Sequence, residues 1–160
     1  MSYLVWKLLH VLGVVLFVGN ITTGILWKVH ADRTRNPALI AHACAGLTRS
    51  DRFFTMPGVA LIVIAGIVAA LTGNFPILGT GWIFWSIALL TISGLAFMLR
   101  IAPLQRRMHA LAAAGAQDGQ LDWPAYAVAT RSWNVWGMIA LSAPLVAVAL
   151  MVLKPTLPGL

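Results

Sequence analysis

Four long apolar runs dominate the sequence, and their length limits what the chain can fold into. They cover residues 3–27, 53–73, 81–101 and 133–153. A helix rises about 1.5 Å per residue, so each run is long enough to cross the roughly 30 Å hydrocarbon core of a bilayer. The chain is 60% hydrophobic and 9% charged, whereas soluble domains carry about 25% charged residues. The sequence therefore predicts an all-α integral membrane protein, a four-helix bundle that forms a single membrane domain over residues 1–160.

Basic residues are distributed unevenly over the segments that join the apolar runs. The first and third linkers, with their flanks, hold nine of the eleven Lys and Arg residues, whereas residues 74–80 hold none. Loops rich in Lys and Arg stay in the cytoplasm, so we expect these two linkers inside and both termini outside. The net charge of +7 follows from this topology and does not indicate a nucleic-acid partner. The nine residues are Lys28, Arg33, Arg35, Arg49, Arg52, Arg100, Arg106, Arg107 and Arg131.

The first cytoplasmic linker contains two helix-start signals. Asn36 before Pro37 is typical of a helix N-terminus, and we expect residues 37–47 to form a short helix lying at the membrane surface. Ser50 and Asp51 directly precede the second apolar run, where a hydroxyl and an acid suit the exposed amides of a new helix.

The second cytoplasmic linker is expected to extend the helices on either side of it. Residues 104–114 are rich in Ala, Leu and Arg, which favour helix, so the third helix should continue past Pro103 into the cytoplasm. Asp122 followed closely by Pro124 predicts the start of the last helix.

Side chains other than plain aliphatics recur along the first helix at alternating steps of three and four. This spacing places them on one face of a helix, so we expect the stripe to face the interior of the bundle. Gly13 and Gly24 would let a neighbouring helix or a flat ligand approach the backbone closely. The stripe consists of Tyr3, Trp6, His10, Gly13, Phe17, Asn20, Gly24 and Trp27.

His10 points most directly to chemistry, because ionisable groups inside a membrane span are rare and usually functional. Three interpretations remain open: a neutral imidazole hydrogen-bonded to a neighbouring helix, an axial ligand of haem iron or another metal, or a proton relay. With the N-terminus outside, His10 lies about two turns below the outer surface. At that depth we expect Trp82, Trp85 and Ser86 beside it. This lining suits a flat apolar cofactor or a quinone ring, although an interfacial aromatic belt also accounts for the two Trp residues.

The candidate cofactor site combines residues of the first and third helices around haem b. A second axial ligand would be Met151, Lys7, a backbone or water atom, or His10 of another subunit in a homo-oligomer. Arg100 is a candidate for holding a haem propionate, or it anchors the third helix at the inner membrane surface. Cys44 is the only cysteine, so no intrachain disulfide or Cys-based metal site is expected. The candidate residues are His10 as metal ligand, with Trp6, Gly13, Phe17, Trp82, Trp85, Ser86 and Arg100.

Two segments carry a resemblance that covers essentially the whole chain. They are the opening Tyr3-Leu-Val-Trp-Lys-Leu-Leu-His10 and the later Arg100-Ile-Ala-Pro-Leu-Gln-Arg-Arg107. Both resemble a bacterial family of four-helix integral membrane proteins with no assigned function. This resemblance implies a multi-pass protein of the bacterial inner membrane.

A more remote resemblance concerns the first helix. Lys7-Leu-Leu-His10, followed by His30, is similar to the first helix of the HemJ-type protoporphyrinogen oxidases, and CopD membrane domains have a similar start. In HemJ-like proteins the first-helix histidine is associated with haem, which implies that role for His10. Those proteins also carry a functional lysine in a later helix. This chain has no lysine between Lys28 and Lys154, so the oxidase activity itself is not carried over.

These observations predict a small cytochrome b-like membrane redox protein. His10 would hold haem near the outer face, and electrons would pass between a quinone or porphyrin and a partner. The alternative is a non-enzymatic structural or assembly subunit of a larger membrane complex. Passage of a metal ion is less favoured, because the membrane-embedded ligands are few. Hydrolysis and phosphoryl transfer are disfavoured, because the sequence has no phosphate-binding glycine loop and no nucleophile elbow.

Overall fold

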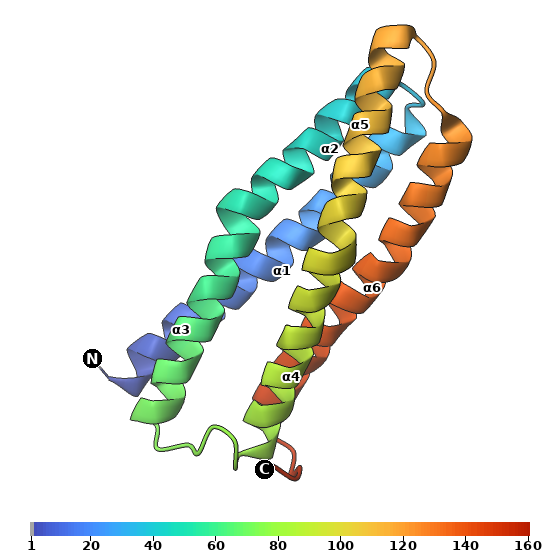
Figure 1. Ribbon diagram of the computed structural model, residues 1–160. Helices are drawn as coiled ribbons and strands as arrows, with labels where there is room; N and C mark the ends of the chain where they lie inside the picture. Colours follow the sequence, from blue (N-terminus) through green and yellow to red (C-terminus); the bar gives the residue numbers. More distant parts are fainter. Residues whose placement is uncertain (1) are drawn as a thin grey trace.

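The computed structural model describes residues 2–160, in which every regular element is a helix and no strand occurs. Four helices in this range are long and apolar enough to span a bilayer, which confirms the predicted all-α membrane architecture (Figure 1). Two short π-helical turns, η1 and η2, lie within the longest helices. In chain order the elements are α1 (Tyr3–Arg33), α2 (Pro37–Ser50), η1 (Asp51–Thr55), α3 (Met56–Thr72), α4 (Gly81–Ala96), η2 (Phe97–Ile101), α5 (Ala102–Asp118) and α6 (Trp123–Leu153).

The second and third long helices each run without a break from the loop at residues 73–80 to the opposite end of the molecule. Elements α2, η1 and α3 form one helix, Pro37–Thr72, and α4, η2 and α5 form another, Gly81–Asp118. The expected separate surface helix over residues 37–47 is therefore wrong, because it runs directly into the second span. Ser50 and Asp51 lie inside this helix, since no glycine or proline between Thr48 and the apolar run interrupts it. The extension of the third helix past its proline is confirmed.

Each π-turn precedes a proline in the middle of a long helix. Pro57 follows η1 and Pro103 follows η2, each as the second residue of the next α-segment. A proline in a helix lacks an N–H and clashes with the carbonyl four residues earlier. The π-turn η1 is wider than an α-helical turn, and here the N–H of Met56 donates to the carbonyl of Asp51, five residues back. The π-turns thus let the second and third long helices continue past their prolines.

The four long helices form two hairpins that meet along part of their length. Within the hairpins α1 packs along α3 and α4 packs along α6, whereas α2 packs against α5 between them. Figure 1 shows α2 and α5 together at the end opposite both chain termini. Contacts between the α1–α3 pair and the α4–α6 pair are few over residues 2–160. The hairpins are therefore joined mainly in the half that the sequence places on the cytoplasmic side.

The hydrophobic core lies in this same half. Most of its members come from α2, α5 and the first half of α6, where the two hairpins meet. They include Ile40, Cys44, Met108, Ala112, Ala129 and Trp133.

The two tight turns at this end begin new helices as the sequence predicts. The side chain of Asn36 accepts hydrogen bonds from the N–H groups of Ala38 at 2.9 Å and Leu39 at 3.3 Å. The side chain of Asp122 accepts one from the N–H of Ala125 at 3.0 Å. Both side chains satisfy amides that a helix N-terminus leaves free.

Candidate functional site

The stripe on α1 faces protein, as the three-four spacing predicts. Gly13 and Phe17 are buried, and Trp6, His10 and Asn20 are partly buried. A Cβ atom on Gly13 would lie 3.0 Å from the backbone nitrogen of Ile62 in α3, so any larger residue would push the two helices apart by a few tenths of an ångström. The stripe ends at Trp27, which is 62% exposed.

His10 lies against α3 through a defined hydrogen bond. Its Nδ1 atom is 2.8 Å from the backbone oxygen of Ile62, and because a carbonyl only accepts, Nδ1 carries the hydrogen. In the neutral ring the lone pair then lies on Nε2, which has no hydrogen-bond partner among residues 2–160. The ring rests over Gly66, where a Cβ atom would come within 2.8 Å of Nδ1. This arrangement matches the interpretation of a hydrogen-bonded imidazole and fixes the tautomer.

The three candidate residues of α4 face a different neighbour. Ser86 donates hydrogen bonds to the carbonyls of Trp82 at 2.7 Å and Ala147 of α6 at 3.3 Å. The indole N–H of Trp85 donates to the carbonyl of Pro158 at 3.1 Å, in the segment after α6. The ring of Trp82 contacts that of Phe75, with ring centroids 5.7 Å apart. Within residues 2–160, no hydrogen bond or ring contact joins these three side chains to His10.

Arg100 lies at a different level from His10. It belongs to η2, is exposed, and holds its guanidinium 5.4 Å from the ring centroid of Trp136. This contact ties the part of the third long helix that carries Arg100 to α6. It fits an anchor at the inner membrane surface better than a partner of a group bound at His10.

Other metal ligands do not gather near His10. His30 and His42 are exposed and His109 is partly buried, all in the half of the molecule that carries the two tight turns. Among residues 2–160 no three His, Cys, Asp or Glu side chains are grouped to hold a metal ion. Of the two side chains of this chain that were proposed as a second axial ligand, that of Lys7 is exposed and that of Met151 is partly buried.

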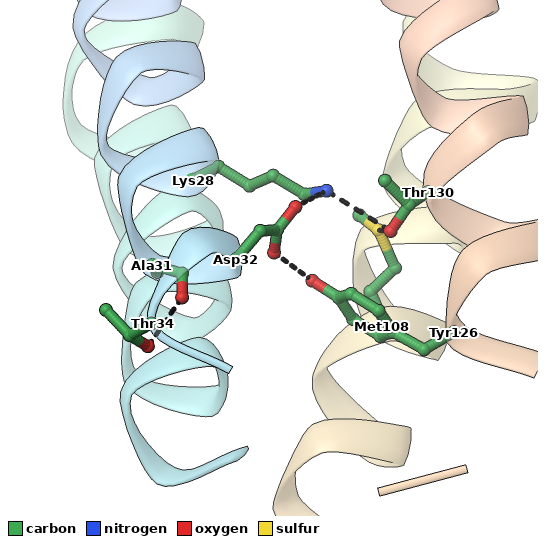
Figure 2. A network of polar contacts seen from close by, with 7 residues as sticks. All are labelled: Lys28, Ala31, Asp32, Thr34, Met108, Tyr126 and Thr130. Atoms are coloured by element: carbon green, nitrogen blue, oxygen red, sulfur yellow. Dashed lines mark hydrogen bonds and ion pairs between the residues drawn. The ribbon is translucent and has the colours of Figure 1, made fainter. Parts of the chain in front are cut away.

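A polar cluster that the sequence analysis did not identify joins the two hairpins at Lys28 (Figure 2). Lys28 is 1% exposed and donates to Asp32 Oδ2 at 2.6 Å and to Thr130 Oγ1 at 3.2 Å. The hydroxyl of Tyr126 donates to Asp32 Oδ1 at 2.6 Å. Thr130 also donates to the sulfur of Met108 at 3.5 Å. The ion pair of α1 is therefore bound on its far side by two side chains of α6.

The Lys28 ammonium is also enclosed by aromatic rings. Its nitrogen lies 5.5 Å from the ring centroid of Tyr126 and 5.4 Å from that of Trp133, distances at which the ring faces attract a cation. A buried charge is stable only when it is paired and hydrogen-bonded. The cluster meets both conditions, so it positions α1 against α6. The spacing of four in Lys28–Asp32 and in Tyr126–Thr130 was a signal for it, because each pair shares one helix face.

Comparison with known proteins places the chain in a family. A family model described as a predicted integral membrane protein (DUF2269) matches residues 4–155. No curated protein and no solved structure matches the chain. The match extends over all four apolar helices and the polar cluster between the hairpins, so the chain belongs to the DUF2269 family of predicted integral membrane proteins.

Proposed function

We propose that this protein is a small haem b-binding redox protein of the bacterial cytoplasmic membrane, with His10 as an axial ligand. In this role it carries electrons between a quinone or porphyrin and a partner. The proposal rests on one observation, the hydrogen bond from His10 Nδ1 to the backbone oxygen of Ile62. Histidines that bind metals generally donate their other ring N–H to such an acceptor, which sets the ring orientation and makes the ligand more basic.

The residues around His10 fit one axial ligand. Gly66 leaves space for the imidazole against α3, and Nε2 has no partner within residues 2–160. Haem would supply one-electron chemistry at this position. The protein side chains would orient the imidazole, exclude water with the apolar face of α3, and provide a second ligand from Met151, Lys7 or His10 of another subunit.

The visible spectrum of the detergent-purified protein from haem-replete cells tests this proposal. We expect a Soret band in the wild type and its loss in His10→Ala, because the ligand is gone while the apolar packing remains. His42→Ala is the matched control, since His42 is exposed and distant, and it should keep the band. Gly66→Leu provides a second variant, because its side chain would occupy the position of the imidazole ring.

A protein that contains no haem and does not bind added haem would overturn the proposal. The remaining function would then be a structural or assembly subunit of a larger membrane complex. One observation favours that second candidate: Asn134 is exposed on α6, near the start of its apolar run. An amide facing acyl chains lacks a hydrogen-bond partner, which a neighbouring membrane protein would supply.

A further inference from the structure

A cavity of about 170 Å³ lies between the two helix hairpins at the level where α2 and α5 give way to α3 and α4. Its walls are mainly apolar and include the aromatic side chains of Phe17, Phe97 and Trp133. A cavity of this size is in the range that holds one six-membered ring, since an apolar cavity of about 150 Å³ binds benzene. The rim includes Met98, which is 65% exposed, so the cavity opens toward the surface that faces the hydrocarbon chains.

One end of this cavity is polar, and it is organised around a carboxylate. Asp51 Oδ2 accepts a hydrogen bond from Gln105 Nε2 at 3.0 Å. Its Oδ1 accepts from Thr55 Oγ1 at 2.8 Å and, more weakly, from Asn20 Nδ2 at 3.4 Å. Asn20 Nδ2 also donates to Thr55 Oγ1 at 2.9 Å. All four residues line the cavity, and we call them the Asp51 cluster.

The Asp51 cluster presents hydrogen-bond acceptors to the cavity. Asn20 and one N–H of Gln105 donate to Asp51 or Thr55, so the carboxylate and the two amide oxygens are the acceptors of the cluster, beside the second N–H of Gln105. Over residues 2–160 no Lys, Arg or His forms an ion pair with Asp51. A ligand that only accepts hydrogen bonds, such as an oxidised quinone, would place its oxygen against the carboxylate with no hydrogen between them. A ligand with an O–H group would satisfy them.

The aromatic wall adds a buried donor. The indole Nε1 of Trp133 is buried and has no hydrogen-bond partner in the part of the chain that the structure describes. Such unsatisfied groups are rare in native proteins. A ligand hydroxyl can donate to the carboxylate of Asp51, whereas a methyl ether cannot donate.

We propose that this cavity binds the ring of a hydroquinone-type amphiphile, with a ring hydroxyl donating to the Asp51 cluster and the alkyl tail leaving past Met98 into the membrane. Asn20 is ten residues from His10 along α1, a separation of about 15 Å in a helix, so the ring and the proposed haem ligand occupy different places. The role of this ligand as an electron donor rests on the proposed haem function. The binding itself does not.

Binding is measured on the full-length protein in detergent, under anaerobic conditions, by isothermal titration. The probes are an alkyl hydroquinone, its oxidised quinone and its dimethyl ether, all with the same decyl tail. We expect the hydroquinone to bind about tenfold tighter than either of the others, because only it donates to the carboxylate. Asp51→Asn should remove most of this preference. Asp118→Asn, at the exposed end of α5, is the matched control and should leave it unchanged.

A steric variant tests the location independently of Asp51. Gly94 lines the cavity, and a Cβ atom added there would meet nothing within 4 Å, so the larger side chain of Gly94→Leu is expected to reduce the space at the cavity wall. It should abolish binding, whereas Gly19→Leu, equally unobstructed but outside the cavity, should bind normally.

Three results would overturn the proposal: equal affinity for the three probes, normal binding by Gly94→Leu, or tighter binding of a decylammonium ion, which would assign the carboxylate to a cation. His10→Ala should bind the hydroquinone normally. A failure of the haem proposal is therefore distinguishable from a failure of this one.

Discussion

At the scale of single residues, Lys28 shows how much a position in sequence can mislead. It follows a long apolar run and precedes several arginines, so its charge is counted with the cytoplasmic linker. In the structure α1 continues to Arg33, and Lys28 is buried between α1 and α6 with Asp32, Tyr126 and Thr130 around its ammonium group. Its charge therefore helps to hold the two hairpins together, and it also counts among the basic residues that predict the orientation in the membrane.

Removing the ammonium should destabilise the protein because it leaves Asp32 in a largely buried site without its partner. For Lys28→Met we expect a loss of about 3 kcal/mol, the lower end of the range for breaking a buried ion pair, since the Asp32 side chain is 25% exposed. Denaturation in detergent followed by circular dichroism measures it. Lys7→Met on the exposed side of α1 is the control and should change stability little. If the double variant Lys28→Met/Asp32→Leu is as unstable as the single one, uncompensated charge is not the cause.

The residues of the candidate site could be predicted only in part. The three-four spacing identified the protein-facing stripe of α1, and the structure confirms it from Trp6 to Gly24. Spacing shows which side chains share a face, but it does not show which helix covers that face. Trp82, Trp85 and Ser86 were placed beside His10 because their depth in the membrane matches, whereas pairing of α4 with α6 directs them elsewhere.

At the scale of elements, the apolar runs predicted the existence of all four spans and understated their length. An apolar run ends where polar residues begin, whereas a helix ends only where its backbone hydrogen bonding is interrupted. Ser50 and Asp51 resemble a helix start, yet their carbonyl and N–H groups remain within a helix because η1 accommodates the later Pro57. A π-turn has no clear sequence signal, so this continuity could not be predicted from residue types alone.

The close contact of α1 with α3 depends on glycine. A side chain on Gly13 would meet the backbone of Ile62 at 3.0 Å and the carbonyl of Gly58 at 3.1 Å, and backbone atoms of two packed helices cannot move aside cheaply. We expect Gly13→Leu to lower the free energy of unfolding by about 1 to 3 kcal/mol, as for other overpacked contacts. Gly19→Leu, on the same helix with open space around it, should leave the midpoint of thermal unfolding near the wild-type value. Equal midpoints for the two variants would contradict a packing role for Gly13.

At the scale of the whole molecule, the two ends differ in charge and in construction. The end with both tight turns holds most of the basic residues and the hydrophobic core. The other end carries both termini and the uncharged loop that links the hairpins (Figure 1). Basic loops remain in the cytoplasm, so this asymmetry predicts the orientation of the molecule in the membrane.

Labelling of single cysteines in intact cells tests that orientation. Asn74→Cys in the linking loop should react with a membrane-impermeant maleimide, and Gln117→Cys near the end of α5 should react only after the cells are opened. Both positions are exposed, whereas the native Cys44 is buried, so the wild-type protein provides the unlabelled control. Labelling of Gln117→Cys but not Asn74→Cys in intact cells would reverse the assignment.

The hydrogen bonds between the hairpins have a consequence for the synthesis of the protein at the ribosome. The first hairpin is synthesised and inserted before the second exists, and it then carries Asp51 without Gln105 and Asp32 without Tyr126. Before the second hairpin is inserted, each of these carboxylates therefore lacks one hydrogen-bond donor that the finished chain supplies. Insertion of the second hairpin supplies these donors, so a product truncated after the first hairpin differs from the complete protein in the hydrogen bonding of Asp32 and Asp51.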